Sequence, residues 1–351
     1  MSIHDGKIVD ITKLKWYSIA IKYLAVQNKE RMKMKKIIAI ILVVLLLTSL
    51  TACQGKKNDG KFKVGVCQLT PHVALDAATQ GFVDALNEEL GAENVEIDVQ
   101  VGGGDTATCA PIVNAFVADD VDLIMANATP ALQAAVAATT DIPILGTSVT
   151  EYGVALDIDN FTGTVGGNIS GTSDLAPLDQ QADMILTLFP EAKNVGLPYC
   201  SAEANSQYQV DTVKALLEAK GVTATLYPFS DSNDVAAVAQ NACDASDVIY
   251  VPTDNTVAAN TGIVDNICQP AGIPVVAGEA GICGGCGVAT LSISYYDLGV
   301  TTGKMAAKIL KGEADIATMP IAYAENFTPQ YNTAICEALG VTVPADYVAL
   351  Q

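Results

Sequence analysis

Residues 123–145 have the sequence LIMANATPALQAAVAATTDIPIL, and this stretch decides the fold class. Leu123–Ala126 is an apolar run with the length of a buried strand, and the alanine-rich segment Thr129–Thr139 predicts a helix. Ile142–Leu145 is a second short apolar run, which predicts another buried strand. A strand, a helix and a strand in immediate succession are typical of a parallel sheet that is covered by helices on both faces.

The same alternation continues on both sides of this unit. Before it we expect strands at Phe62–Cys67 and Val95–Val101, a helix at Leu75–Leu90, and a helix that is capped by Asp105 or Thr106 and ends at Ala118. After about residue 175 the pattern begins again. Helices are expected at Leu178–Leu188, Ala202–Ala219, Asp234–Ala242, Thr256–Cys268 and Asp297–Leu310, and strands at Asn194–Leu197, Thr223–Tyr227, Val248–Val251, Ile273–Val276 and Val288–Ile293. We therefore predict an α/β protein with two doubly wound parallel-sheet lobes.

A short hydrophobic segment near the N-terminus predicts export. The basic residues Lys33, Lys35 and Lys36 precede an apolar run of 14 residues, Ile37–Leu50, which leads into Leu50-Thr51-Ala52-Cys53. A membrane-spanning helix needs about 20 residues, whereas the core of a signal peptide has roughly 7–15. We therefore interpret residues 1–53 as a signal peptide that ends in a bacterial lipobox, with Cys53 as the lipidated residue.

The alternative is an uncleaved membrane anchor in which Cys53 is incidental. Residues 1–31 are long for the charged start of a signal peptide, so we expect translation to begin at Met32 or Met34. Residues 54–61 are polar and contain glycine, which predicts a short tether between the lipid anchor and the folded domain. The expected location is the extracytoplasmic face of the cell membrane.

The charge of the chain restricts its partners. Residues 1–52 hold 9 of the 19 Lys and Arg residues and 3 of the 39 Asp and Glu residues, which leaves 10 basic and 36 acidic residues and a net charge of −26. Such a surface repels the phosphates of nucleic acids, so no nucleic-acid partner is expected. Arg31 is the sole arginine of the sequence. Because anionic ligands are usually held by guanidinium groups, a zwitterionic or neutral solute is the expected ligand.

Eight cysteines follow Cys53, and most of them lie in apolar segments, which favours free buried thiols over a disulfide framework. Cys283-Gly-Gly-Cys286 is the one pair at short spacing. It lacks a second ligand pair for zinc and the sequence context of a redox motif. We interpret it as a loop that holds two thiols or a local disulfide. The sequence therefore indicates neither a metal site nor a cofactor.

Polar residues follow the predicted strands at one consistent position. The carboxyl ends of parallel strands meet at one edge of a sheet, where open α/β sheets bind their ligands. His72 is the one histidine after the signal peptide, and ligand contact and ordinary solvent exposure are equally open for it. The candidate binding residues at these strand ends are Leu69, Thr70, His72, Thr129, Pro130, Thr147, Ser148, Tyr199, Asp254, Asn255 and Glu279.

No catalytic set is recognisable in the sequence. It contains no nucleophile elbow of the form G-x-S-x-G, and a Ser–His–Asp set would have to use His72. Pairs of acidic residues carry little weight in a chain with 39 of them. We therefore predict that the protein is not an enzyme.

Six stretches of the sequence match one family of proteins in order. They are Val64-Gly65-Val66 with Gly81-Phe82, Ala128–Gln133, Gly171–Asp174, Tyr199–Ser206, Val251–Thr256 and Asp297–Met305. With them the chain resembles the ABC-transporter substrate-binding lipoproteins of the type I periplasmic-binding-protein fold, in the branch with tryptophan- and tyrosine-binding members. The matching stretches add Ser173, Asp174 and Ser206 to the candidate binding residues. Residues 281–287, with their two cysteines, depart from the family pattern.

The resemblance implies two lobes that are joined by three crossovers and close on a ligand by a hinge movement. The first lobe would comprise residues 62–172 plus about 295–318, and the second 173–294 plus about 319–351. The resemblance also implies that the solute is delivered to a membrane permease with a cytoplasmic ATPase. We expect the protein to be a monomer.

We therefore expect a lipid-anchored solute receptor of an ABC importer. Its ligand would be a small amino-acid-like zwitterion, with an aromatic side chain as one option. The ligand carboxylate would meet hydroxyl and helix N–H groups around Thr129 and Ser173. The amine would meet Asp254 or Glu279, and the side chain would stack on Tyr199. A sensory receptor of the same fold is the first alternative, and an exported enzyme is the second.

Overall fold

The computed structural model describes residues 60–324 and 326–350. The predicted signal peptide, the lipidated Cys53 and most of the predicted tether lie outside these residues, and so does Gln351. From Gly60 onward the chain is one unit, whose two sheets define two lobes.

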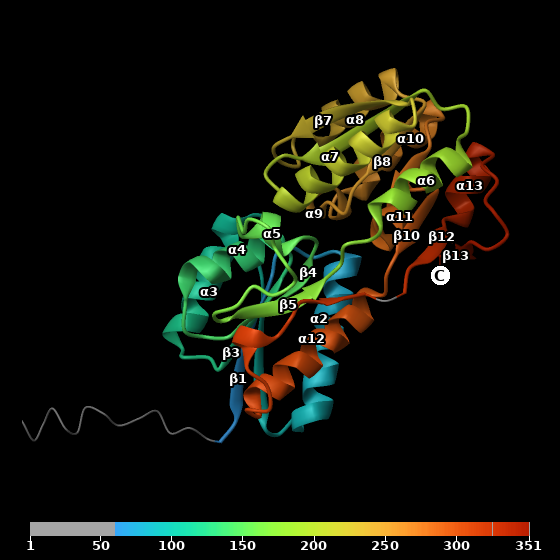
Figure 1. Cartoon of the computed structure of the whole chain (residues 1–351). Coiled ribbons are helices and arrows are strands. Elements are labelled where there is room, and N and C mark those ends of the chain that lie inside the picture. Colours follow the sequence, from blue (N-terminus) through green and yellow to red (C-terminus); the bar gives the residue numbers. More distant parts are fainter. Residues whose placement is uncertain (1–59, 325, 351) are drawn as a thin grey trace, which may run out of the picture. The chain divides into compact units, whose positions relative to one another are not determined.

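The first lobe is built around a six-stranded sheet with the order β11-β5-β4-β3-β1-β2 (Figure 1). Every neighbouring pair of strands in it is parallel. Its strands are β1 (Phe62–Gln68), β2 (Val95–Val101), β3 (Leu123–Asn127), β4 (Ile144–Val149), β5 (Ile169–Ser173) and β11 (Ala322–Tyr323). Its helices are α2 (Val73–Leu90), α3 (Thr106–Ala118), α4 (Thr129–Ala138), α5 (Tyr152–Ala155) and α12 (Tyr295–Leu310), with a 3-10 turn at Ile316–Thr318.

Two apolar layers hold this lobe together. Helices α3 and α4 cover one face of the sheet, where Phe116 and Leu132 are buried against Ile124. Helices α2 and α12 cover the other face, where Phe82 packs with Met125. Each face of the sheet is thus covered by its own pair of helices, as the alternation of short apolar runs and amphipathic segments predicts.

The second lobe contains a seven-stranded sheet with the order β13-β12-β10-β9-β8-β6-β7. Its strands are β6 (Asn194–Cys200), β7 (Thr223–Phe229), β8 (Val248–Val251), β9 (Val275–Ala277), β10 (Ala289–Ser292), β12 (Thr328–Tyr331) and β13 (Val348–Ala349). Its helices are α6 (Leu178–Leu188), α7 (Ala204–Ala219), α8 (Val235–Ala245), α9 (Asn255–Ala258), α10 (Thr261–Ala271), α11 (Ala280–Cys286) and α13 (Thr333–Leu339). Strand β12 is antiparallel to β10, so this sheet is not wholly parallel as the sequence predicts. The reason is that the chain leaves β10 for the first lobe and returns from that lobe into β12, so β12 starts near the edge where β10 ends and runs in the opposite direction.

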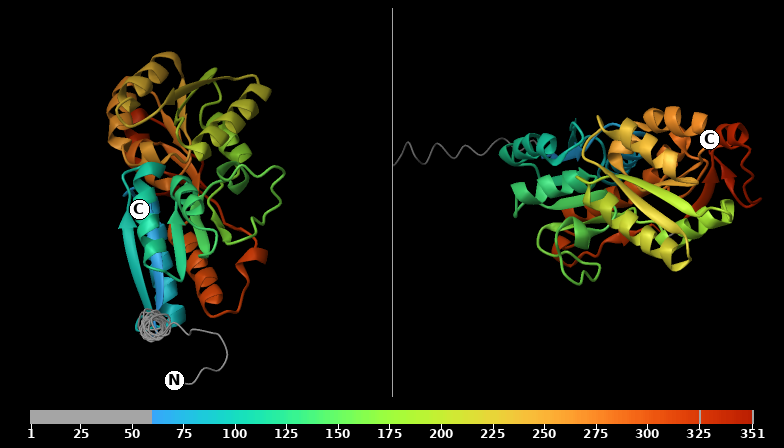
Figure 2. Two further views of the ribbon diagram at one scale, coloured as in Figure 1. Left: turned by 90° about the vertical axis from the view of Figure 1, so that its left-hand side faces the viewer. Right: turned by 90° about the horizontal axis from the view of Figure 1, so that it is seen from above.

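The chain passes between the two sheets three times (Figures 1 and 2). The passages lie between β5 and α6, between β10 and α12, and between β11 and β12. Two lobes with three crossovers are the architecture that the family resemblance implies. The returning segment α12 completes the helical layer of the first lobe, although it follows the second lobe in sequence.

Helices α2 and α12 lie side by side at unusually close range (Figure 1). A Cβ atom on Gly81 of α2 would lie 2.1 Å from the carbonyl oxygen of Tyr296, and one on Gly299 of α12 would lie 2.0 Å from that of Ala78. Only glycine fits at these two contacts. The close packing matters for the site, because α2 begins after His72 and α12 begins at Tyr295.

Two local expectations are wrong. The segment Thr256–Cys268 is not one helix, because the backbone leaves the helical conformation at Asn260 and divides it into α9 and α10. Cys283 and Cys286 lie in the helix α11 and not in a loop, since the carboxylate of Glu279 caps the first turn. Both cysteines are buried free thiols, as the sequence favours for most of its cysteines, and the alternative of a local disulfide is not met.

Candidate ligand-binding site

A small pocket lies between the carboxyl ends of strands from both lobes. It holds about 270 Å3 of space between atoms, part of which is open to solvent. The first lobe contributes residues that follow β1 and β4, and the second contributes residues that follow β8 and β9. We call this site the inner pocket. Its lining residues are His72, Ala74, Leu75, Ser148, Thr150, Asp174, Asn205, Thr253, Asp254, Asn255, Ala258, Glu279 and Tyr295.

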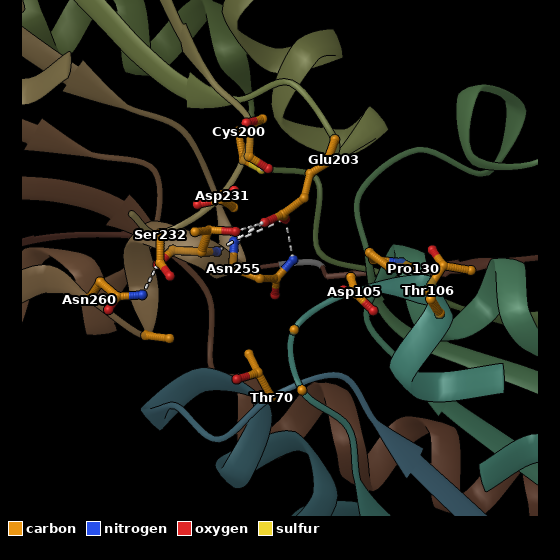
Figure 3. A pocket seen from close by; sticks show the side chains of 17 residues that line it. Thr70, Asp105, Thr106, Pro130, Cys200, Glu203, Asp231, Ser232, Asn255 and Asn260 are labelled. Carbon is orange, nitrogen blue, oxygen red and sulfur yellow. Dashed lines mark hydrogen bonds between the residues drawn. The ribbon is translucent and has the colours of Figure 1, made fainter. Parts of the chain in front are cut away.

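A wider outer cavity adjoins the inner pocket and shares Asn255 with it (Figure 3). Its volume is about 1040 Å3, including space that is open to solvent. Thr70 and Pro130 line it from the first lobe, and Glu203 and Asn255 line it from the second. The outer cavity therefore lies between the two lobes, beside the inner pocket, and opens to solvent.

Glu203 anchors the second-lobe side of the cleft. Its carboxylate is buried and accepts four hydrogen bonds from the start of α9 (Figure 3). The donors are the backbone N–H and side-chain amide of Asn255, at 3.0 and 2.6 Å, and the backbone N–H and hydroxyl of Thr256, at 2.9 and 2.8 Å. Bonds to a charged acceptor are stronger than neutral ones. The network therefore fixes the orientation of the Asn255 amide, whose Nδ2 donates to Glu203.

His72 joins the two lobes across the cleft. Its Nε2 lies 3.2 Å from Oδ1 of Asn255 in the opposite lobe. Because Nδ2 of Asn255 is committed to Glu203, Oδ1 accepts and Nε2 of His72 donates. Burial lowers the pKa of His72, against the opposing influence of Asn255, Glu203 and Asp76. The ring is therefore neutral at pH 7, with Nδ1 as a bare acceptor.

Asp174 lies just after β5, where the chain leaves the first lobe, and is 4% exposed. Its Oδ2 accepts a hydrogen bond from the hydroxyl of Tyr295 at 2.9 Å. Its Oδ1 has no partner in hydrogen-bonding geometry among the described residues. Burial raises the pKa of Asp174, and the hydroxyls of Thr150 and Tyr295 offset part of this effect.

Asp254 and Glu279 cap the helices that follow β8 and β9. The two oxygens of Asp254 accept the backbone N–H groups of Val257 and Cys200, at 2.9 and 2.7 Å. Those of Glu279 accept the N–H groups of Gly281 and Ile282. Burial raises the pKa of Asp254 to about 7, with a further contribution from Glu203. Burial also raises the pKa of Glu279 to about 7.

The inner pocket holds three carboxylates without a cationic side chain. Neither a lysine nor an arginine is among its lining residues or those of the outer cavity. Removing a carboxylate from water is costly unless a positive charge or several donors accompany it. The pocket is therefore complementary to a small ligand that carries a positive charge.

Polar atoms without partners are concentrated in the inner pocket. Of the eight buried side-chain polar atoms that lack a hydrogen bond among the described residues, four belong to its lining. They are Nδ1 of His72, Oγ of Ser148, Oδ1 of Asp174 and Oδ1 of Asn205. Buried polar groups in folded proteins are nearly always paired. Such a concentration indicates that these atoms are directed at a ligand.

Ser148 reaches the pocket through an irregular end of β4. The strand pairing shifts its register between Gly146 and Val149, and Ser148 has a φ of 52°. A positive φ costs a residue with a side chain of the order of 1–3 kcal/mol and persists mainly at functional sites. This backbone conformation allows Ser148 to line the pocket although both of its neighbours lie in the buried end of the strand.

The structure divides the 14 predicted binding residues into three groups. Six line the inner pocket: His72, Ser148, Asp174, Asp254, Asn255 and Glu279. Two line the outer cavity: Thr70 and Pro130. Six line neither: Leu69, Thr129, Thr147, Ser173, Tyr199 and Ser206.

The residues of the last group have other structural roles. Leu69 and Tyr199 are buried in the cores of the first and the second lobe. The hydroxyl of Thr147 bonds to neighbouring threonines inside the first lobe, and that of Ser173 donates to the carbonyl oxygen of Thr150. Ser206 is buried behind Asn205, whose amide lies 3.3 Å from its hydroxyl. Thr129 is the first residue of α4, and its hydroxyl has no partner in the described part of the chain.

Sequence reasoning missed several residues of the site. Thr150, Asn205, Thr253 and Tyr295 line the inner pocket, and Glu203 orients Asn255 from behind. Asn205 and Glu203 stand in the stretch Tyr199–Ser206 that carries the family resemblance, so that stretch was the available signal. Tyr295 has no such signal, because it reaches the site only through the return of the chain to the first lobe.

Comparison with known proteins decides the family. The family model of the ABC transporter substrate binding protein matches residues 63–350. The chain belongs to this family. A curated relative, the tyrosine-binding protein of Clostridioides difficile, is 34% identical over 307 residues, which cover 82% of this chain and 88% of the relative. Membership implies a small-molecule ligand, an ABC transporter as partner and an extracytoplasmic place of action.

Two solved structures of similar proteins bear on the state of the cleft. A Streptococcus pneumoniae structure in complex with L-Trp has 32% identity and a TM-score of 0.79, and the match covers 83% of this chain and 100% of that chain. The ligand-free, open structure of a substrate-binding protein with adhesive properties from Clostridium difficile has 37% identity, with 83% and 99% coverage, but a TM-score of only 0.64. Sequence identity does not explain this difference. In this structure the bond between His72 and Asn255 joins the two lobes across the cleft.

Two further kinds of feature are absent from residues 60–324 and 326–350. No helix there is both long and apolar enough to span a membrane. No three His, Cys, Asp or Glu side chains there are grouped so that they could hold a metal ion.

Proposed function

We propose that the protein is the lipid-anchored solute receptor of an ABC importer and that its ligand is a free amino acid. One observation carries the choice of ligand. A pocket between the lobes buries three carboxylates and supplies no cationic side chain, so the ligand has to bring the positive charge. The α-ammonium group of an amino acid provides this charge.

The opposite end of the ligand has a different environment. The hydroxyl of Ser148 is an unpaired donor, and α4 starts at the cleft without a side-chain cap on its first turn. The free N–H groups of a helix start attract a carboxylate. We assign the ligand carboxylate to Ser148 and the start of α4, where the unpaired hydroxyl of Thr129 lies as well.

The remaining lining favours a ligand with an apolar or aromatic body. Ala74, Leu75 and Ala258 provide apolar surface, and Tyr295 is the aromatic residue of the inner pocket. This role was expected of Tyr199, which lies in the core of the second lobe instead. The tyrosine-binding relative and the L-Trp complex support tyrosine and tryptophan as the first probes. A role in binding and delivery requires no catalytic activity.

The lipid anchor rests on sequence alone. The basic cluster, the apolar run Ile37–Leu50 and Leu50-Thr51-Ala52-Cys53 support cleavage before Cys53 and attachment of the mature protein to the outer face of the membrane. Two acyl chains hold a protein at a membrane where one is marginal. The protein would then present its cleft to solutes outside the cytoplasm as a monomer.

Two measurements on the full-length chain, purified in detergent, test the ligand. Mass spectrometry of the small molecules released on denaturation identifies what copurifies, and isothermal titration calorimetry with the 20 common amino acids measures affinity. We expect one or a few amino acids to bind without being converted. Binding of a sugar or nucleoside in their place, or chemical conversion of the bound molecule, would contradict the proposal.

A separate experiment tests the anchor. Expression of wild type and Cys53→Ala in a bacterial host with a labelled fatty acid should label only the wild type, which should also partition into detergent phase. The control is Cys336→Ala, which removes a buried cysteine near the C-terminal end of the sequence and should leave the label intact. A labelled Cys53→Ala protein would show that Cys53 is incidental.

A further inference from the structure

Three acceptor atoms of the inner pocket are buried and have no hydrogen-bond donor among the described residues. They are Nδ1 of His72, Oδ1 of Asp174 and Oδ1 of Asn205. We propose that these three atoms form a three-point site for a primary ammonium group, which carries three N–H donors. The inference rests on the proposed amino-acid ligand, and it adds which atoms hold the amine and that the amine must be unsubstituted.

In each of these three side chains, the second polar atom makes a hydrogen bond that leaves the first atom as a free acceptor. The bond to Asn255 places the proton of His72 on Nε2 and leaves Nδ1 bare. The side-chain nitrogen of Asn205 donates to the carbonyl oxygen of Thr253 at 3.0 Å, which leaves its oxygen for the pocket. Asp174 uses Oδ2 for the hydroxyl of Tyr295, and only Oδ1 is free. Asp174 and Asn205 are each 4% exposed, so water cannot readily replace a missing donor.

The sequence-based expectation assigned the amine to Asp254 or Glu279, and the hydrogen bonds favour Asp174. Both oxygens of Asp254 and of Glu279 already accept backbone N–H groups at the starts of α9 and α11. These two carboxylates add negative charge around the ammonium group. Asp174 also brings a carboxylate, and its Oδ1 has no donor among the described residues.

The three acceptors come from different parts of the chain. His72 precedes α2 in the first lobe, Asp174 lies where the chain leaves that lobe, and Asn205 is in the first turn of α7 in the second lobe. An ammonium group that bonds to all three connects the lobes directly. A ligand that contacts both lobes binds the closed state more tightly than the open one and shifts the population toward it.

The site also requires a neutral His72. Protonation would turn Nδ1 into a donor and place a positive charge against the ammonium group. The groups that act on His72 are amide or acidic: Asn255, Glu203 and Asp76, with Asp174, Asp254 and Glu279 around the same pocket. Acidification also neutralises Asp174, so both titrations weaken binding as the pH falls below the ordinary histidine value of 6.5.

The test uses isothermal titration calorimetry on the full-length chain with L-tyrosine and L-tryptophan as probes. Each is compared with its N-methyl derivative and with the 2-hydroxy acid that has a hydroxyl in place of the amine. An N-methyl group removes one donor and leaves one buried acceptor unpaired, so we expect roughly 10- to 100-fold weaker binding. The 2-hydroxy acid also lacks the charge and should bind more weakly still.

Two variants assign the effect to named atoms. Asp174→Asn keeps the shape of the side chain and removes its charge, and we expect roughly 100-fold weaker binding of the amino acid. His72→Gln retains a donor near the position of Nε2 for Asn255 but removes the acceptor Nδ1, and should weaken binding roughly tenfold. Asp98→Asn changes the charge of an exposed carboxylate on β2 by the same amount and should bind as the wild type does.

Coupling between ligand and variant separates a lost hydrogen bond from a steric effect. If Nδ1 of His72 accepts an ammonium N–H, N-methylation should weaken binding less in His72→Gln than in the wild type. Amino acids that tolerate N-methylation within about threefold, or that bind Asp174→Asn as tightly as wild type, would overturn the three-point site and leave the proposed function intact. If no ammonium-bearing probe binds while another solute does, both proposals fail.

Discussion

Asp174 and Tyr295 illustrate how one hydroxyl determines the state of a buried carboxylate. Burial raises the pKa of Asp174, and the bond from Tyr295 is one of the contacts that lower it in part. Without that donor, Asp174 would hold its proton more tightly and present less negative charge to a ligand. We therefore expect the hydroxyl of Tyr295 to affect ligand affinity through Asp174, without contact with the ammonium group.

The first prediction concerns this hydroxyl. Tyr295→Phe removes one hydrogen bond to Asp174, so we expect roughly five- to tenfold weaker binding of the amino acid at about pH 7. Because the pKa of Asp174 rises further in the variant, affinity should recover in part at higher pH. Calorimetry between about pH 6 and 8.5 measures both effects. The neighbouring Tyr296→Phe, which loses a bond to the exposed Asp84, is the control and should change neither. Equal pH profiles for the two variants would contradict the coupling.

A second residue acts by orienting another. Glu203→Gln replaces an oxygen by an amide nitrogen where Asn255 and Thr256 supply four donors, so at least one donor loses its acceptor. We expect a loss of about 1–3 kcal/mol in the free energy of unfolding, measured by urea denaturation, together with weaker ligand binding. Glu218→Gln removes an exposed ion pair with Lys214 and should cost less than about 0.5 kcal/mol. Equal losses for the two variants would show that the network does not stabilise the lobe.

At the scale of whole elements, α2 and α12 act as one unit behind the site. Their glycine contacts bring the helices close enough for His72 and Tyr295 to reach the same pocket. The two helices are about 200 residues apart in the chain, yet they form one layer of the first lobe. The packing of this layer therefore determines where two ligand-facing side chains lie.

The element-scale prediction tests this packing. Glycine to alanine in a helix usually stabilises a protein by roughly 1 kcal/mol or less. Gly299→Ala should do the opposite and cost about 1–3 kcal/mol, because its Cβ would lie 2.0 Å from the carbonyl oxygen of Ala78 and force the helices apart. Gly284→Ala in α11 is the matched control, since no atom lies within 4 Å of the added Cβ. Urea denaturation measures both variants, and a stable Gly299→Ala protein would show that the helices separate at little cost.

At the scale of the whole molecule, the buried acids oppose folding in a way that depends on pH. Asp254 and Glu279 have ordinary pKa values of 3.8 and 4.5, which burial raises to about 7 in the folded protein. The folded state then binds more protons than the unfolded state between about pH 4 and 7, so stability falls as the pH rises through this range. His72 acts in the opposite direction, because burial lowers its pKa, but it is one group against these two and Asp174.

We therefore expect the melting temperature of the ligand-free protein to be lower at about pH 7.5 than at pH 5, as measured by differential scanning calorimetry at constant ionic strength. Glu279→Gln removes one of the responsible groups and should make the decline smaller, whereas the surface variant Asp98→Asn should preserve it. A bound amino acid should also reduce the decline, because its ammonium group favours the charged carboxylates. A melting temperature that is constant or rises over this range would contradict the assignment.

The pattern of the sequence predicts the elements well, because each depends on local chemistry. A strand such as Val248–Val251 and a helix such as Leu178–Leu188 have the predicted bounds, since the spacing of apolar residues reports which face is buried. Irregular segments were predicted less well. The division of Thr256–Cys268 depends on the non-helical backbone at Asn260, and the helix at Cys283 depends on a cap from Glu279, neither of which changes the apolar pattern.

The sequence by itself determined that this is a two-lobed α/β protein of a solute-binding family, with polar residues at the carboxyl ends of its strands and no arginine after residue 31 to hold an anion. Only the tertiary structure decided which polar atoms are free for a ligand. Tyr199 lies in the core of the second lobe, and the hydroxyl of Ser173 donates to the carbonyl oxygen of Thr150. Tyr295 and Asn205 line the inner pocket. The physical reason is that apolar periodicity encodes burial residue by residue, whereas a free lone pair depends on partners such as His72 and Asn255, which are 183 residues apart and come from different lobes.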